Sequence, residues 1–133
     1  MRIDVLKKLN TTFSHVPIFI LKEGESLNRH AFFSLFSNTD KKYLLAFEKK
    51  SPLKNGHSHL IFTPEGREVV LIGIAPKKDF NHRKAMLALR RVIQYARKEK
   101  IKKYAFNLND FSASDFKGDI KDLAEVMAMQ CEI

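Results

Sequence analysis

His57 and His59 stand two positions apart and are the nearest pair of histidines in the chain. In a β-strand, side chains two positions apart point to the same face, so both imidazoles would lie on one side of a sheet. A zinc site takes three or four protein ligands, and no third candidate lies close by in the sequence. The spacing therefore favours two ordinary polar side chains, and we predict no metal site in this chain.

The other histidines and the single cysteine show no catalytic pattern. His15, His30 and His82 are scattered, and we interpret each as a surface or capping residue. Cys131 continues an apolar helical pattern, which indicates a small core residue, and no histidine close to it in sequence could activate it as a nucleophile. A lone cysteine also excludes an intrachain disulfide and a cysteine-based zinc site. We therefore predict no catalytic residue.

Three aspartates, Asp115, Asp119 and Asp122, lie near the start of the last predicted helix. Acidic side chains interact favourably with the positive end of a helix dipole, so we assign them a structural role. The turn after residues 69–74 reads Ala-Pro-Lys-Lys-Asp and has no glycine. A phosphate cradle needs glycines for close backbone approach, which argues against a nucleotide cofactor at this turn.

Basic residues concentrate in the window 82–103, which contributes +8 of the net charge of +9. On a helix, six of them would form one basic face: Arg83, Lys84, Arg90, Arg91, Arg97 and Lys98. Such a face is either the solvated side of an amphipathic helix or a contact for nucleic acid or another subunit. No aromatic residues interleave with the cations, which favours the solvated face.

The stretch 68–108 must position these cations, and it reads as strand, turn, helix and strand. Residues 69–74 are apolar apart from Gly73, which is typical of a strand buried on both faces. Asn81 is a good helix N-cap. An apolar stripe follows at three- and four-residue spacing: Ala85, Met86, Leu89, Val92, Ile93 and Ala96. With a second strand at 104–108, the pattern predicts a βαβ unit with parallel pairing and a right-handed crossover.

The N-terminal half has weaker signals. Residues 16–21 predict a short strand, and 27–36 predict a helix whose Phe32, Phe33 and Phe36 belong to the core, with base stacking as the alternative. Asn38 or Thr39 could cap a helix over 40–49.

The segments around the βαβ unit complete the pattern. Residues 59–63 and 68–74 predict an antiparallel hairpin at the edge of the sheet. Residues 109–118 read as a polar loop, and the last helix begins at Asp119. Its predicted buried face consists of Ile120, Leu123, Ala124, Met127 and Cys131.

This alternation predicts an α/β protein with helices on both faces of a mixed sheet. The 133 residues, 44% of them hydrophobic, suit one domain spanning 1–133. No apolar run reaches the roughly 20 residues of a membrane helix, and no signal peptide is recognisable, so we expect a soluble cytoplasmic protein without membrane contact. The helical pattern continues to Ile133 without a stop signal, which predicts one domain of a longer polypeptide.

The stretch 69–108 resembles the N-terminal domain of the leucyl (cytosol) aminopeptidase family. That domain has a Val-Leu-Leu-Val-Gly-Leu-like strand end, a Gly-Lys-Lys-Asp-like turn, a long helix and a second strand. The residues that match in order are Val70, Leu71, Ile72, Gly73, Ile74, Lys77, Lys78 and Asp79. Residues 115–133 resemble the last helix of that domain, whereas 1–60 agree only in layout. Ala75 and Pro76 depart from the pattern, because the family often has a glycine there.

The resemblance implies a macro-domain-like, three-layer α/β/α sandwich with a parallel βαβ core. It implies a non-catalytic domain that contacts other subunits of a homo-oligomer and, in some members, nucleic acid. The family removes N-terminal residues from peptides with two divalent metals, zinc or manganese, held by Lys, Asp and Glu side chains of a C-terminal catalytic domain. Nothing in this sequence matches that domain, so no catalytic or metal-binding residue is carried over.

Three functions from different classes follow from these observations. The first is the assembly or regulatory domain of a metal-dependent leucyl aminopeptidase. The second is a nucleic-acid-binding module that uses the basic helix face. The third is an ADP-ribose-binding domain, by analogy with macro domains alone, against which the turn without glycine counts.

Overall fold

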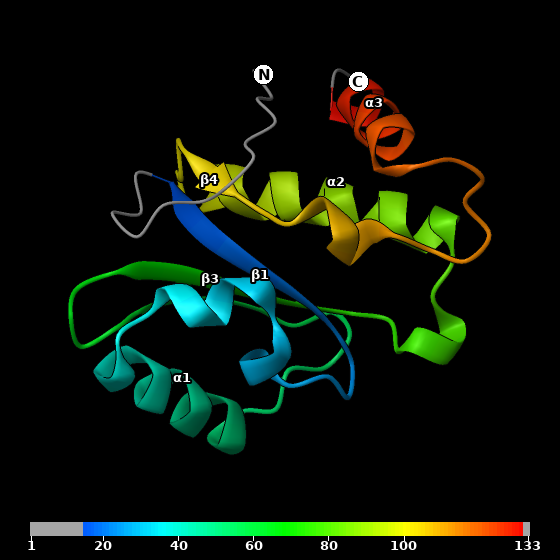
Figure 1. Ribbon diagram of the computed structural model, residues 1–133. Coiled ribbons are helices and arrows are strands. Elements are labelled where there is room, and N and C mark those ends of the chain that lie inside the picture. The colour runs from blue at the N-terminus through cyan, green and yellow to red at the C-terminus, as the bar shows by residue number, and fades with distance from the viewer. Residues whose placement is uncertain (1–14, 132–133) are drawn as a thin grey trace.

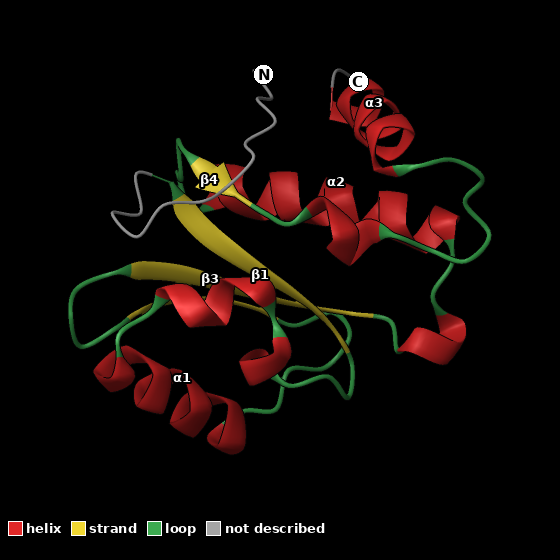
Figure 2. Ribbon diagram, viewed as in Figure 1, coloured by secondary structure: helices red, strands yellow, loops and turns green. Residues whose placement is uncertain are grey.

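The computed structural model describes residues 15–131 (Figure 1, Figure 2). Its main elements are β1 (Val16–Lys22), α1 (Asn38–Lys50), β2 (Ser58–Phe62), β3 (Glu68–Ile74), α2 (His82–Lys98), β4 (Tyr104–Ala105) and α3 (Ile120–Cys131). Short 3-10 helices occupy connections: η1 (Leu27–Arg29), η2 (Ala31–Leu35), η3 (Lys77–Asp79) and η4 (Leu108–Phe111). The predicted continuation of the last helix to Ile133 and the side chain of Cys131 lie outside what is described.

The four strands form one mixed sheet in the order β2-β3-β1-β4. β1 pairs in parallel with β3 on one side and with β4 on the other, whereas β2 and β3 form the predicted antiparallel hairpin at the edge. The predicted direct pairing of strands 69–74 and 104–108 is wrong, because β1 lies between them. β1 takes that place since its residues from Pro17 to Leu21 are all buried, as a central strand requires.

Helices cover both faces of the sheet (Figure 1). Phe19, Leu21 and Leu71 pack with α1, η1 and η2, and the alternate residues Ile18 and Ile20 pack with α2 and α3. The prediction of an α/β protein with helices on both faces of a mixed sheet is confirmed. None of the helices in the described range is both long enough and apolar enough to cross a membrane.

Gly73 is the penultimate residue of the buried strand β3, and a glycine within a strand lowers its stability. A Cβ atom at this position would stand only 2.1 Å from the backbone oxygen of Lys54. The loop after α1 therefore crosses the strand at a distance that only glycine permits. The backbone N–H of Gly56 also donates to the Gly73 carbonyl over 3.1 Å, which fastens this loop to the sheet.

The amphipathic helix α2 is the element that the sequence predicted best. The Oδ1 atom of Asn81 accepts a hydrogen bond from the Lys84 N–H at 2.9 Å, which confirms the predicted N-cap. The buried residues of α2 are Ala85, Met86, Ala88, Leu89, Val92, Ile93 and Ala96. At the other end, the Ile101 N–H donates to the Ala96 carbonyl at 2.9 Å, and Lys100 has a φ of 58°. This is a Schellman ending in which lysine occupies the position that glycine favours.

Residues 27–36 form two short 3-10 helices, so the predicted helix is corrected. His30 separates them in an extended conformation, and its ring nitrogen accepts the Phe32 N–H. Phe32 and Phe36 are buried and Phe33 is half-buried, as predicted for core residues.

The start of α1 is also corrected. The helix begins at Asn38 and its N-cap is Ser37, whose hydroxyl accepts the N–H of Asp40 at 3.3 Å. Asn38 and Thr39, the predicted caps, lie within the first turn because Ser37 already has the extended backbone of a cap residue.

The C-terminal part differs from its prediction at three points. The predicted strand 104–108 shortens to Tyr104–Ala105, and the predicted polar loop starts with η4, whose Phe111 is fully buried. Leu123 and Met127 are buried in α3 as predicted, and Ala124 is half-buried. Ile120, which we predicted to be buried, is 44% exposed at the first position of α3.

Asp119 and Asp122 close the first turn of α3 through two reciprocal hydrogen bonds of 3.0 Å, each side chain accepting from the backbone N–H of the other residue. The Oδ1 atom of Asp115 accepts the N–H of His82 at 2.8 Å, which ties the preceding loop to α2. Asp119 and Asp122 therefore act at the start of the last helix as predicted, whereas Asp115 has a structural role at the start of α2 instead.

Replacing Lys100 by glycine is expected to raise the free energy of unfolding by about 0.5–1 kcal/mol, because a side chain at positive φ carries a steric cost that glycine avoids. Urea denaturation measures this change. Lys100→Ala is the matched control, because it removes the same charge but keeps the Cβ atom. Equal stabilities of the two variants would contradict the prediction.

Candidate functional site

A cavity lies at the carboxyl ends of β1 and β4. The chain after β1 turns to the α1 face of the sheet, and the chain after β4 turns to the face covered by α2 and α3. Adjacent parallel strands whose continuations diverge in this way leave a crevice at their carboxyl ends, the usual ligand site of open α/β sheets. The cavity measures about 710 Å³. Its lining consists of Ile20, Leu21, Gly24, Glu25, Ser26, Asn28, Arg29, His30, Ala31, Asn107 and Asp110.

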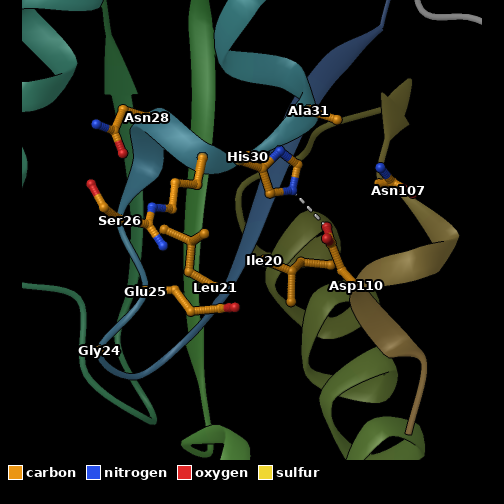
Figure 3. Close-up of a pocket in the computed structure, with 11 residues that line it drawn as sticks. Ile20, Leu21, Gly24, Glu25, Ser26, Asn28, His30, Ala31, Asn107 and Asp110 are labelled. Carbon is orange, nitrogen blue, oxygen red and sulfur yellow. Dashed lines mark hydrogen bonds and ion pairs between the residues drawn. The ribbon is translucent and has the colours of Figure 1, made fainter.

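A buried pair, His30 and Asp110, joins the two walls of this β1–β4 cavity. The Nε2 atom of His30 and the Oδ2 atom of Asp110 are 2.7 Å apart, although 80 positions separate the residues in sequence. Their side chains are only 3% and 15% exposed. Figure 3 shows Asn107 and Asp110, which follow β4, across from Ser26 and Asn28, which follow β1, with His30 between them.

The hydrogen bonds of His30 fix its tautomer. Nδ1 accepts the backbone N–H of Phe32 at 3.1 Å, so the ring proton is on Nε2 and is donated to Asp110. The rings of Phe19 and Phe32 pack against the imidazole, with centroids at 4.9 and 5.1 Å. Because both nitrogens are engaged, this histidine cannot act as a general base while the pair is intact. Its role is to hold the carboxylate of Asp110.

Asp110 is the ionisable group that this environment perturbs. Burial raises the pKa of Asp110, and the hydrogen bond from His30 lowers it in part. The charge of Lys22 also lowers the pKa, and that of Glu25 raises it. The second carboxyl oxygen, Oδ1, has no hydrogen-bond partner among residues 15–131. One oxygen is therefore fixed, and the other is available to a ligand.

The rim on the β1 side is anchored to α1. Glu48 accepts hydrogen bonds from the Ser26 hydroxyl at 2.9 Å and from the Leu27 N–H at 2.7 Å. Across the opening, the Oδ1 atom of Asn107 accepts the N–H of Asn109 at 3.0 Å, which leaves the amide group of that side chain as a donor. Hydrogen bonds to the backbone thus anchor both sides of the opening locally.

None of the six basic residues singled out in the sequence lines this cavity. Arg83, Lys84, Arg90, Arg97 and Lys98 are exposed on α2. Arg91 differs, because its guanidinium donates to the Gly73 carbonyl at 3.1 Å and to the Ser58 hydroxyl at 3.3 Å. Burial lowers the pKa of Arg91. It links α2 to the β2–β3 hairpin and has a structural role.

The remaining histidines do not assemble a site. His57 and His59 lie with ring centroids 6.1 Å apart, and His59 packs edge-on against Phe47. His82 stacks on Phe116 at 4.8 Å. Within the described range, no three or more His, Cys, Asp or Glu side chains are grouped so that they could hold a metal.

Sequence reasoning missed Asp110 as a site residue and assigned His30 only a surface or capping role. The capping role is correct, because the ring accepts the Phe32 N–H, but the residue is buried. The available signal was the position of Asp110 soon after the last predicted strand, where ligand-contacting side chains of α/β sheets are found. No protein-family model matches the chain, and no curated protein resembles it closely enough to count as a match.

Asp110→Asn is expected to flatten part of the pH dependence of stability. Because the pKa of Asp110 is raised in the folded protein, folding favours the protonated carboxyl. The favourable contribution is complete below the ordinary aspartate pKa of about 3.9 and is lost as pH rises through the higher folded pKa. The stability of the variant relative to the unmodified protein should therefore increase with pH over that window.

Urea denaturation of both proteins at a series of pH values from about 3.5 to 7 measures this difference. An asparagine oxygen can still accept from His30, so the hydrogen bond is retained in the variant. A stability difference that does not change with pH, or that falls as pH rises, would show that the carboxyl is not penalised by burial.

Proposed function

We propose that this chain is a non-catalytic domain of the type found at the N-terminus of leucyl aminopeptidases, acting in the assembly or regulation of a cytoplasmic homo-oligomer. Its covalent partner would be a C-terminal catalytic domain that holds two zinc or manganese ions and removes N-terminal residues from peptides. In this proposal the sheet and its helices are the macro-domain-like α/β/α sandwich of that family.

The observation that carries the proposal is the match over β3 and the turn that follows it. The matching residues 70–74 and 77–79 form one continuous unit of buried strand and 3-10 turn that leads into α2. At Gly73, one of the matching residues, packing requires glycine because the backbone of Lys54 crosses the strand there. Supporting the non-catalytic role, the only buried histidine of the cavity among the described residues has both ring nitrogens engaged.

Binding of nucleic acid is a second candidate function, and the exposure of the basic face of α2 favours it. Arg83, Arg97 and Lys98 all reach solvent on this helix. Side chains of this kind neutralise phosphates without reading sequence. The inward position of Arg91 removes one cation from the face that we predicted.

The native protein provides the first test. Immunoprecipitated from its source with an antibody against this chain, it should be larger than 15.4 kDa and should cleave a leucine anilide only with zinc or manganese present. The isolated chain should show no cleavage with either metal. A native mass near 15.4 kDa, or metal-dependent cleavage by the isolated chain, would overturn the proposal.

The nucleic-acid alternative requires a salt-dependent affinity that the basic face supplies. Replacing Arg83, Arg97 and Lys98 by glutamate should weaken duplex DNA binding and lower the slope of log K against log salt by roughly 2.7, at about 0.9 for each phosphate contact. The matched control replaces Lys42, Lys49 and Lys50, which are exposed on α1, and changes the net charge equally. Equal losses of affinity in both triple variants would show that binding depends on overall charge and would contradict a specific role of the basic face.

A further inference from the structure

The β1–β4 cavity presents unengaged groups of both charges. Asp110 retains one free carboxyl oxygen, and Glu25 retains another, because only its Oε1 atom accepts the Lys22 N–H, at 2.9 Å. The guanidinium of Arg29 has no partner among residues 15–131. Acceptors that carry negative charge and donors that carry positive charge thus line one opening. Groups of this kind gain most from a ligand that brings the opposite charge to each.

This mixture of charges disfavours several classes of occupant. A simple anion would face the carboxylates of Glu25 and Asp110, and a simple cation would face Arg29. An apolar ligand would remove water from all these groups without replacing their hydrogen bonds. A ligand with a positive end and a negative end satisfies both sets.

We propose that the β1–β4 cavity binds a short zwitterionic peptide, its terminal ammonium contacting Asp110 and Glu25 and its terminal carboxylate contacting Arg29. The cavity volume of about 710 Å³ lies within the range of roughly 300–1,000 Å³ that is usual for ligand sites. That volume exceeds the needs of a single amino acid, so a peptide of two or three residues fits better. Side-chain amides of Asn28 and Asn107 are suited to the peptide groups between the ends.

His30 is a positioning residue in this site. Its Nε2–H holds one oxygen of Asp110, and the backbone N–H of Phe32 holds its other nitrogen, so the second oxygen of Asp110 keeps one direction. Glu48 fixes the rim that carries Arg29 by its bonds to Ser26 and Leu27. A pre-organised pair of this kind lowers the ordering cost of binding. The inference goes beyond the proposed function and does not depend on it.

Titration of the ¹⁵N-labelled chain with trialanine, followed by NMR, tests the proposal. Amide resonances of Gly24, Ala31 and Asn107 should shift. Arg29→Gln and Asp110→Asn should each weaken binding by about tenfold or more, because each removes a charge-assisted contact. Arg83→Gln, which removes an exposed arginine of α2 outside the cavity, is the matched control and should leave the affinity unchanged.

Blocked peptides show which end meets which residue. N-acetylated trialanine lacks the ammonium, so its weaker binding should no longer respond to Asp110→Asn. Trialanine amide lacks the carboxylate and should no longer respond to Arg29→Gln. Arg29 is exposed, so its variant should fold even if the Asp110 variant does not.

The proposal is overturned if trialanine at millimolar concentration shifts none of these resonances. It is also overturned if both blocked peptides bind as well as trialanine, or if inorganic phosphate or ADP-ribose binds more tightly, since that would identify an anion site at Arg29. These results concern a ligand only, so they leave the oligomer and catalytic domain of the proposed function to the native-protein experiment.

Discussion

The burial of β1 between two parallel neighbours is the constraint on which the other elements depend. Residues of this strand face two separate apolar clusters, so both faces of the sheet must be covered by helices. The strands β3 and β4 run in the same direction, so a short loop cannot connect them and α2 crosses one face of the sheet between them. On the other face, α1 leads from β1 to β2, which lie on opposite sides of β3. The segment after β1 packs on the α1 face of the sheet, and the segment after β4 packs on the face covered by α2 and α3, so the two segments are separated. The cavity is therefore a product of the topology, and its polar residues are those that the diverging segments happen to carry.

The elements with a strong local pattern could be predicted from the sequence. The N-cap Asn81 and the apolar stripe of α2 lie within one continuous stretch, so spacing alone places them. The continuous apolar run of β3 and its hairpin with β2 are likewise local. The interruption of residues 27–36 at the extended residue His30 could not be predicted in this way, because the ring of His30 contacts Asp110, which lies 80 positions further on. Strand neighbours also depend on long-range pairing, which explains why β1 was not placed between β3 and β4.

The candidate site shows the same limit more clearly. His30 could be identified as a capping residue, since the Phe32 N–H lies two positions away. Its carboxylate partner lies 80 positions further on, and the position of Asp110 soon after the last predicted strand does not indicate that it would contact His30. Helical period placed six cations on one face of α2, but period cannot show that the β2–β3 hairpin offers acceptors to Arg91. Contacts that define the chemistry are thus the ones that only the folded chain brings together.

The two-residue length of β4 has a consequence for motion. The β1–β4 ladder pairs only Val16 with Tyr104 and Pro17 with Ala105, and a proline has no amide to donate. The wall that carries Asp110 is therefore held largely by side-chain packing around the buried Phe111. Such a segment can detach in a sub-global opening while the β1–β3 ladder stays closed. Amide hydrogens of η4 would then exchange faster than those of β3, and the cavity would lose one wall without the protein unfolding.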